Sequence, residues 1–93
     1  MEVLHDQARQ RFYIPIEGGE EAVLMYRRES ETIDFEHTSV PASARERGLA
    51  ERLVETGFLF AQTNHLKVIP TCSYISGSFL RKHPEFLPLV ASP

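Results

Sequence analysis

The chain has 93 residues, a length that predicts a single domain spanning residues 1–93. Its composition, 42% hydrophobic and 25% charged, is that of a folded globular protein and excludes a disordered chain. The formal net charge of −3 gives no general reason to expect nucleic acid as a partner. Basic residues nonetheless cluster at positions 45–52 and 81–83, where local patches can bind phosphate.

The compartment is predicted from the single cysteine and from the lack of long apolar runs. One cysteine excludes an internal disulfide and favours a reducing compartment. No run approaches the length of about 20 apolar residues that spans a bilayer. Residues 1–6 lack the charged and apolar regions of a signal peptide. We therefore expect a cytoplasmic protein with no membrane partner.

The first half of the chain predicts an antiparallel meander. Residues 1–9 are polar and predict an irregular segment. From residue 10 onward, alternating apolar residues predict strands, and turns rich in glycine or charged residues separate these strands. The three predicted strands are residues 10–16, 22–28 and 32–40.

The third predicted strand carries a histidine close to its end. By strict alternation Ile33, Phe35, His37 and Ser39 share one face, so His37 is expected to continue an apolar face. Such a residue is either a packing histidine or, because a turn follows it, a functional one.

A long helix is predicted over residues 44–64 from apolar residues at helical spacing. Ser43 and Glu46 have the spacing of a capping box, in which each side chain satisfies a backbone N–H group at the start of the helix. Asn64 suits the left-handed residue that ends many helices. Gly57, inside the helix, is expected to permit close approach to the sheet.

After the helix, the apolar residues 66–70 predict a short buried strand, parallel to residues 32–40 through a right-handed crossover. A second helix is predicted over residues 74–82, and His83-Pro84 ends it. The resulting α/β (α+β) fold is a three-stranded meander followed by a long helix, a parallel strand and a short helix.

The turn between the third strand and the long helix is a predicted phosphate site. The first N–H groups of a helix have no partner within the helix and carry the positive end of its dipole. An anion placed there accepts hydrogen bonds from these N–H groups and is attracted by the positive end of the dipole. Arg45 and Arg47 add positive charge. The alternative is a well-capped helix that binds no ligand. Metal binding is not expected, because the four histidines and the cysteine lack the short paired spacings of zinc sites.

Four segments carry a resemblance to a known family. They are His37-Thr38-x-Val40-Pro41, Arg45-x-x-Gly48-Leu49-Ala50-x-x-Leu53-Val54, Val68-Ile69-Pro70-x-Cys72-Ser73-Tyr74 and His83-Pro84-Glu85-Phe86. Together they resemble the small, single-domain GNAT acetyltransferases, which keep little more than the half of the fold that binds acetyl-CoA. The resemblance covers residues 10–90. It departs at Glu46, where the family often has glycine, so a carboxylate stands beside the expected diphosphate.

The resemblance implies acetyl-CoA as cofactor and a set of residues that bind it. The N–H groups of residues 47–50 would hold the diphosphate, the end of the third strand would pair with the pantetheine arm, and basic residues near His83 would meet the remaining phosphate. The implied cofactor-binding residues are Ser39, Val40, Arg45, Arg47, Gly48, Leu49, Ala50, Arg81 and Lys82.

Cys72 and His37 are the implied catalytic residues. Cys72 follows a strand and precedes a helix, and a helix N-terminus favours the thiolate form. The resemblance implies a nucleophile or acid near the thioester, and the alternative is a buried structural cysteine. His37 would act as base for Cys72 or for the incoming amine. Tyr74 is either a further proton donor or a packing residue.

The function that follows is transfer of an acetyl group from acetyl-CoA to an amine of a small molecule or a protein. The second reading is a module that binds CoA, an acyl-CoA or a protein without turnover, since so short a chain has few loops to enclose an acceptor. A third is a redox sensor built on Cys72, although no resolving cysteine is present.

Overall fold

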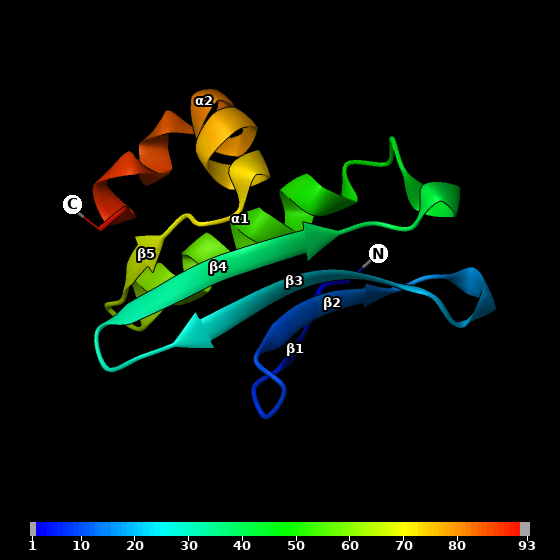
Figure 1. Cartoon of the computed structure of the whole chain (residues 1–93), viewed down its shortest axis with the longest axis horizontal. Helices are drawn as coiled ribbons and strands as arrows, with labels where there is room; N and C mark the ends of the chain where they lie inside the picture. The colour runs from blue at the N-terminus through cyan, green and yellow to red at the C-terminus, as the bar shows by residue number, and fades with distance from the viewer. Residues whose placement is uncertain (1, 92–93) are drawn as a thin grey trace.

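The computed structural model describes residues 2–91. Its five strands form one sheet in the order β1-β2-β3-β4-β5, antiparallel from β1 to β4, with β5 parallel to β4 (Figure 1). The strands are β1 (Leu4–Asp6), β2 (Arg11–Pro15), β3 (Glu21–Arg28), β4 (Thr32–Ser39) and β5 (Lys67–Ile69). The helices are α1 (Leu49–Thr63) and α2 (Leu80–Lys82), with a π turn η3 (Ile75–Phe79) directly before α2. Short 3-10 segments are η1 (Glu17–Gly19), η2 (Ala42–Ala44) and η4 (Pro84–Leu89).

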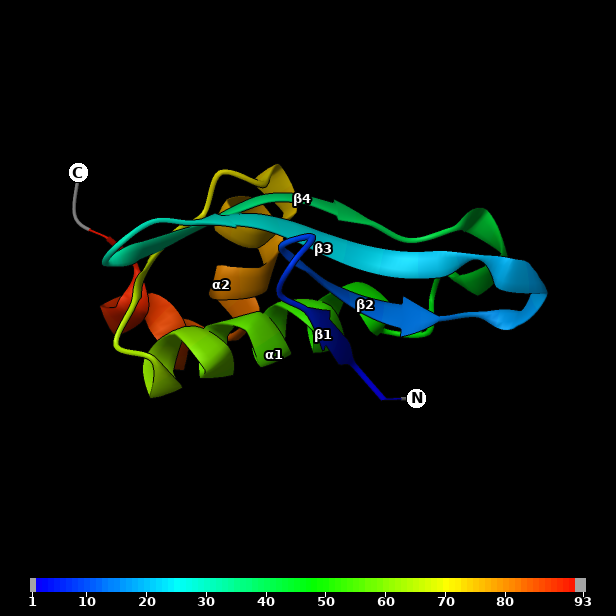
Figure 2. The same cartoon turned by 90° about the horizontal axis from the view of Figure 1, so that it is seen from below.

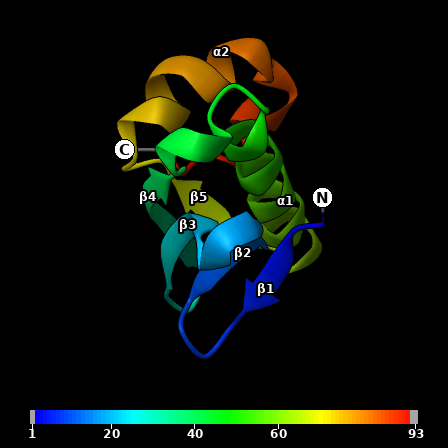
Figure 3. The same ribbon diagram turned by 90° about the vertical axis from the view of Figure 1, so that its right-hand side faces the viewer.

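The core lies between one face of the sheet and α1. Figure 2 shows α1 running across that face, and Figure 3 shows α2 beyond the side of the sheet where β4 and β5 lie, beside α1. The buried side chains of β2, β3 and β4 alternate along each strand and meet Leu53, Val54 and Phe58 of α1. The predicted mixed α/β fold is therefore confirmed, including the parallel strand after the long helix.

Residues 4–6 form a strand, so the prediction of an irregular segment there was wrong. The ring of His5 stacks on Phe12 with 4.1 Å between centroids, and its Nε2 lies 2.6 Å from the hydroxyl oxygen of Tyr26. These contacts join residues that are distant in sequence, and polar local composition does not reveal them. β1 is thus formed by tertiary packing rather than by its own strand propensity.

A β-bulge in β4 changes which side chains face the core. Tyr26 pairs with Phe35 but Met25 pairs with His37, so Glu36 is an extra residue in β4. Beyond the bulge the alternation is reversed, and His37 is exposed whereas Thr38 is half-buried. The expectation that His37 continues the apolar face was therefore wrong.

α1 begins at Leu49 rather than near Ala44. Gly48 is its N-cap residue, in the left-handed conformation with φ of 71°. The predicted capping box was wrong, because Ser43 and Glu46 precede the helix and the Ser43 hydroxyl donates to Glu20 Oε1 at 3.1 Å. A glycine in the left-handed region interrupts the helical pattern that local spacing had extended to residue 44.

The other end of α1 differs from prediction by one residue. Asn64 has φ of −98°, and His65 has φ of 57°, so His65 is the left-handed residue. Gly57 does permit the close approach expected of it. A Cβ atom at this position would lie 2.8 Å from Cζ of Phe35 and 3.0 Å from Cδ2 of Leu24.

Within residues 2–91, no helix is both long enough and apolar enough to cross a membrane.

Candidate cofactor site

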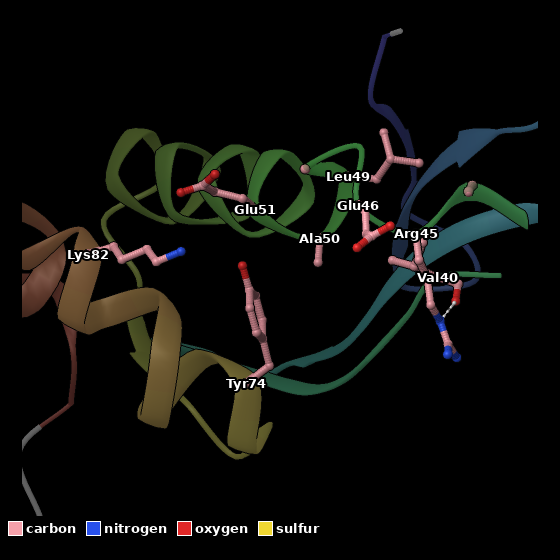
Figure 4. A pocket seen from close by; sticks show the side chains of 10 residues that line it. Val40, Arg45, Glu46, Leu49, Ala50, Glu51, Tyr74 and Lys82 are labelled. Carbon is pink, nitrogen blue, oxygen red and sulfur yellow. Dashed lines mark hydrogen bonds between the residues drawn. The ribbon is translucent and has the colours of Figure 1, made fainter. Parts of the chain in front are cut away.

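A cavity of about 300 Å³ opens where α1 begins (Figure 4). The end of β4 and the turn after it form one side, the first turn of α1 forms the second, and the helical segment after β5 forms the third. Its lining residues are Val40, Ala44, Arg45, Glu46, Gly48, Leu49, Ala50, Glu51, Tyr74 and Lys82.

The N-terminus of α1 supplies backbone donors to this cavity. Among residues 2–91 no side chain caps the helix, and its N-cap residue Gly48 lines the cavity together with Leu49 and Ala50. The N–H groups of a first helical turn have no acceptor within the helix and lie at the positive end of its dipole. This arrangement can bind an anionic group such as a phosphate.

β4 and β5 separate next to the cavity. Their paired register ends at Asp34 and Ile69, and one more bond follows, from the Cys72 N–H to the Phe35 carbonyl oxygen at 2.9 Å. β4 continues to Ser39 while the chain after β5 turns into a helix. The edge of β4 beyond the bulge can therefore pair with a ligand that carries amide groups.

The charges that line the cavity are mixed. Figure 4 shows the carboxylate of Glu46 directed into the cavity and the amino group of Lys82 approaching from the opposite side. The guanidinium of Arg45 is turned back, and its Nε donates to the Val40 carbonyl oxygen at 3.2 Å. Glu46 has φ of 70°, a conformation that favours glycine.

Cys72 lies at the point where β4 and β5 separate. The residue is buried, with 9% of its surface exposed, and its Sγ is 3.4 Å from Oγ1 of Thr38. Its carbonyl oxygen accepts from the N–H groups of Ile75 and Ser76 at the start of the following helix. The bulge in β4 thus makes Thr38, and not His37, the β4 neighbour of the thiol.

Tyr74 crosses the cavity from the segment after β5. Figure 4 shows its ring extending toward α1, with the hydroxyl near Ala50 and Glu51. Burial raises the pKa of the Tyr74 hydroxyl, and the negative charge of Glu51 raises it further. The hydroxyl is therefore held in its protonated form and can donate a proton.

The structure brings together six of the nine predicted cofactor-binding residues. Those lining the cavity are Val40, Arg45, Gly48, Leu49, Ala50 and Lys82. The side chain of Ser39 is exposed on the same face of β4 as His37. Arg47 and Arg81 are exposed outside the lining, and the Arg81 guanidinium donates to the carbonyl oxygen of Gly77 in the preceding turn η3.

Sequence reasoning missed Ala44 and Glu51 as lining residues. Glu51 lies three positions after Gly48, so it belongs to the first turn of the helix once the helix start is placed at Leu49. The helix dipole favours Asp and Glu in the first turn of any helix, so the sequence alone does not distinguish Glu51 as a lining residue. Only the position of the helix after β5 reveals that this side chain faces a cavity.

The sequence of the chain is similar to those of known proteins. Residues 11–89 match the sequence model of the GCN5-related N-acetyltransferase family. The chain is 35% identical over 91 residues to Protein NATD1 of Danio rerio, covering 94% of this chain and 82% of that protein. It is 34% identical over 84 residues to Protein NATD1 of Homo sapiens, covering 88% of this chain and 74% of that protein.

A solved structure shares the fold. The NMR structure of a GCN5-like protein from Staphylococcus aureus superimposes with a TM-score of 0.74, covering 99% of this chain and 89% of that one. The two sequences are 24% identical, so this likeness supports the fold alone.

Proposed function

The chain belongs to the GCN5-related N-acetyltransferase family, and from this premise we propose that it transfers an acetyl group from acetyl-CoA to an amine. The observation that carries the proposal is the cavity in which the uncapped N-terminus of α1 meets the separating edges of β4 and β5. The diphosphate of the cofactor fits the N-terminus of α1, and the amide-bearing pantetheine arm fits the edge of β4 where it separates from β5. Residues 1–93 would perform this as a single domain.

The residues present fit acetyl-CoA in their donor chemistry. The N–H groups of residues 48–50 would hold the diphosphate, and Lys82 would neutralise part of its charge across the cavity. The edge of β4 near Val40 would pair with the pantetheine amides. Acetyl-CoA, when bound, would supply an activated thioester near Cys72 and Tyr74.

Two side chains on opposite sides of β4 would then donate and accept the protons of the reaction. The protonated hydroxyl of Tyr74 faces the cavity and would donate a proton to the departing thiolate. His37 lies on the outer side of β4, because of the bulge, and would accept a proton from an amine arriving there. Cys72 is buried and outside the cavity lining, which favours direct attack by the amine over prior acylation of the thiol.

The second candidate is a module that binds CoA or an acyl-CoA without turnover. Two carboxylates, Glu46 and Glu51, line a cavity that would have to receive a polyanion. β1 and β2 are joined by residues 7–10 alone, so no helix between them covers an acceptor. Both features favour weak or non-catalytic binding.

Calorimetric titration with acetyl-CoA tests both candidates, followed by an assay of acetyl transfer to a panel of amines. Lys82→Met should weaken binding, because it removes the cation opposite the helix N-terminus. Arg81→Met is the matched control, since Arg81 is adjacent in sequence but outside the lining, and its affinity should equal that of the wild type.

Three results distinguish the candidates. Binding together with transfer supports the acetyltransferase. Binding without transfer to any amine supports the non-catalytic module. Absence of binding at millimolar acetyl-CoA, or equal losses in Lys82→Met and Arg81→Met, would contradict the site.

A further inference from the structure

One side-chain contact joins two of the three walls of the cavity, the first turn of α1 and the helical segment after β5. Nε2 of His83 lies 2.5 Å from Oε2 of Glu51. Glu51 belongs to the first turn of α1, whereas His83 follows α2 directly and precedes η4. The contact therefore connects α1 to the helical segment that carries Tyr74 and Lys82.

The imidazole is held in place on its other sides as well. Its ring stacks on Phe79, with 4.4 Å between centroids and an interplanar angle of 21°. Its Nδ1 lies 3.5 Å from Oε2 of Glu85, which belongs to η4. One carboxylate from α1 and one from η4 thus face the two ring nitrogens.

These neighbours make the contact dependent on protonation. The hydrogen bond with Glu51 raises the pKa of His83, and the hydrogen bond with Glu85 raises it further. The hydrogen bond with His83 lowers the pKa of Glu51, and the charge of Lys82 contributes in the same direction. Near neutral pH the pair therefore gains from an imidazolium on one side and a carboxylate on the other.

The position of Glu51 links this pair to the cavity. Its side chain lines the cavity, as does Lys82, the residue immediately before His83. The hydroxyl of Tyr74 points toward the same turn of α1 (Figure 4). Any change in the distance between α1 and the segment 74–83 would change the placement of Tyr74 and Lys82 relative to the helix N-terminus.

We propose that Glu51 and His83 form a proton-linked latch that holds these two walls of the cavity at the spacing its ligand requires. They are positioning residues for Tyr74 and Lys82, and neither needs to contact the reacting atoms. This inference rests on the proposed function, because it takes acetyl-CoA as the ligand whose affinity reports the latch.

The sign of the pH dependence follows from the two ionisations. The imidazolium is present below the raised pKa of His83 and is lost as the pH rises through it. The latch therefore weakens on going from mildly acidic to alkaline pH, and ligand affinity falls with it. Glu51 stays ionised over this range, because its pKa is lowered from an already acidic value.

The test is calorimetric titration of the full chain with acetyl-CoA between pH 6 and pH 9. The wild-type affinity should fall about fivefold over this range, at the lower end of the usual coupling between sites. His83→Gln should show a flat pH profile relative to the wild type, since a glutamine amide can donate to Glu51 without titrating. Glu85→Gln is the matched control and should keep most of the pH dependence, because the contact with Glu51 remains.

A second measurement needs no ligand. In an NMR titration of the free protein, the resonances of His83, assigned by their loss in His83→Gln, should report a pKa above 6.5. In Glu51→Gln the same resonances should titrate closer to the ordinary value. Titration at one and the same pH in the wild type and in Glu51→Gln would overturn the latch.

The outcomes separate the latch from the proposed function. Binding by the wild type with parallel pH profiles in the wild type and His83→Gln overturns the latch and leaves the acetyltransferase proposal standing. No binding by the wild type at any pH overturns the proposed function itself. A uniform loss of affinity in His83→Gln at every pH would indicate a merely structural contact and would also overturn the latch.

Discussion

Replacement of Glu46 by glycine should raise both the stability of the protein and its affinity for acetyl-CoA. Glu46 has φ of 70°, in the left-handed region, and its side chain enters the cavity (Figure 4). The substitution therefore removes a strained backbone conformation and a negative charge at the same position. Both effects act in a favourable direction, which is unusual for a residue at a functional site.

The magnitude of the stability change follows from two opposing contributions. A residue with a Cβ atom in the left-handed region costs about 1–2 kcal/mol, and glycine avoids this cost. Glycine also gives the unfolded chain more freedom, which costs about 0.4–1 kcal/mol. The net gain in the free energy of unfolding is then about 0–1.6 kcal/mol. Its midpoint of about 0.8 kcal/mol is equivalent to a rise in Tm of roughly 3–6 °C for a domain of this size.

The change in affinity comes from the charge. A carboxylate about 4 Å from a phosphate in a water-exposed site repels it by roughly 1 kcal/mol. Its removal should strengthen acetyl-CoA binding about fivefold, as measured by titration calorimetry. Glu46→Gln separates the two effects, because it removes the charge and keeps the strained backbone, so the affinity should rise without a rise in Tm.

Two further variants serve as controls for the backbone argument. His65→Gly relieves the same kind of conformation, φ of 57°, at the far end of α1, so Tm should rise while the affinity stays unchanged. Gly48→Ala should lower Tm by about the amount that Glu46→Gly raises it, since a Cβ atom there meets no neighbour within 4 Å and only φ of 71° is strained. A lower Tm in Glu46→Gly, or no change in affinity in both Glu46 variants, would refute the reasoning.

Three other changes have defined outcomes. Gly57→Ala should lower the free energy of unfolding, measured by chemical denaturation, by about 1 kcal/mol, because the steric overlap of the new Cβ atom with Phe35 outweighs the gain in helix propensity. A variant more stable than the wild type would contradict the close packing of α1 on the sheet. Thr38→Val should change the rate of Cys72 alkylation by iodoacetamide at a fixed pH, whereas Thr38→Ser should preserve that rate because it keeps the hydroxyl. Equal rates in all three chains would show that the Oγ1–Sγ contact has no effect on the thiol. Burial lowers the pKa of His5, so protonation of its imidazole at acidic pH should destabilise the docking of β1. Hydrogen exchange of the β1 amides, corrected for intrinsic exchange, should therefore rise at low pH in the wild type but not in His5→Phe. A corrected exchange rate that does not change with pH in the wild type would refute this prediction.

The bulge in β4 is the clearest case in which sequence reasoning was insufficient. Alternation along residues 33–39 predicts one face for Phe35 and His37, and each residue type is compatible with that pattern. The extra residue, Glu36, reverses the alternation because β3 pairs with β4 on both sides of it, and Arg27 of β3 forms an ion pair with Glu36 at 2.9 Å. This preference arises between strands, so no local pattern in β4 records it.

The family and the order of the strands and long helix from β2 onward were determined by local features of the sequence. Period-two alternation, turn residues, a helical apolar pattern and the Arg45-x-x-Gly48-x-Ala50 turn are each read from neighbours in the chain, and all are present in the structure. Only the tertiary structure placed Glu51 opposite His83, turned Thr38 toward Cys72 and aimed Glu46 into the cavity. Those placements depend on contacts between residues far apart in the chain, whose geometry is decided by how α1 and the segment after β5 pack around the sheet. The helix and strand propensities of single segments do not predict that packing.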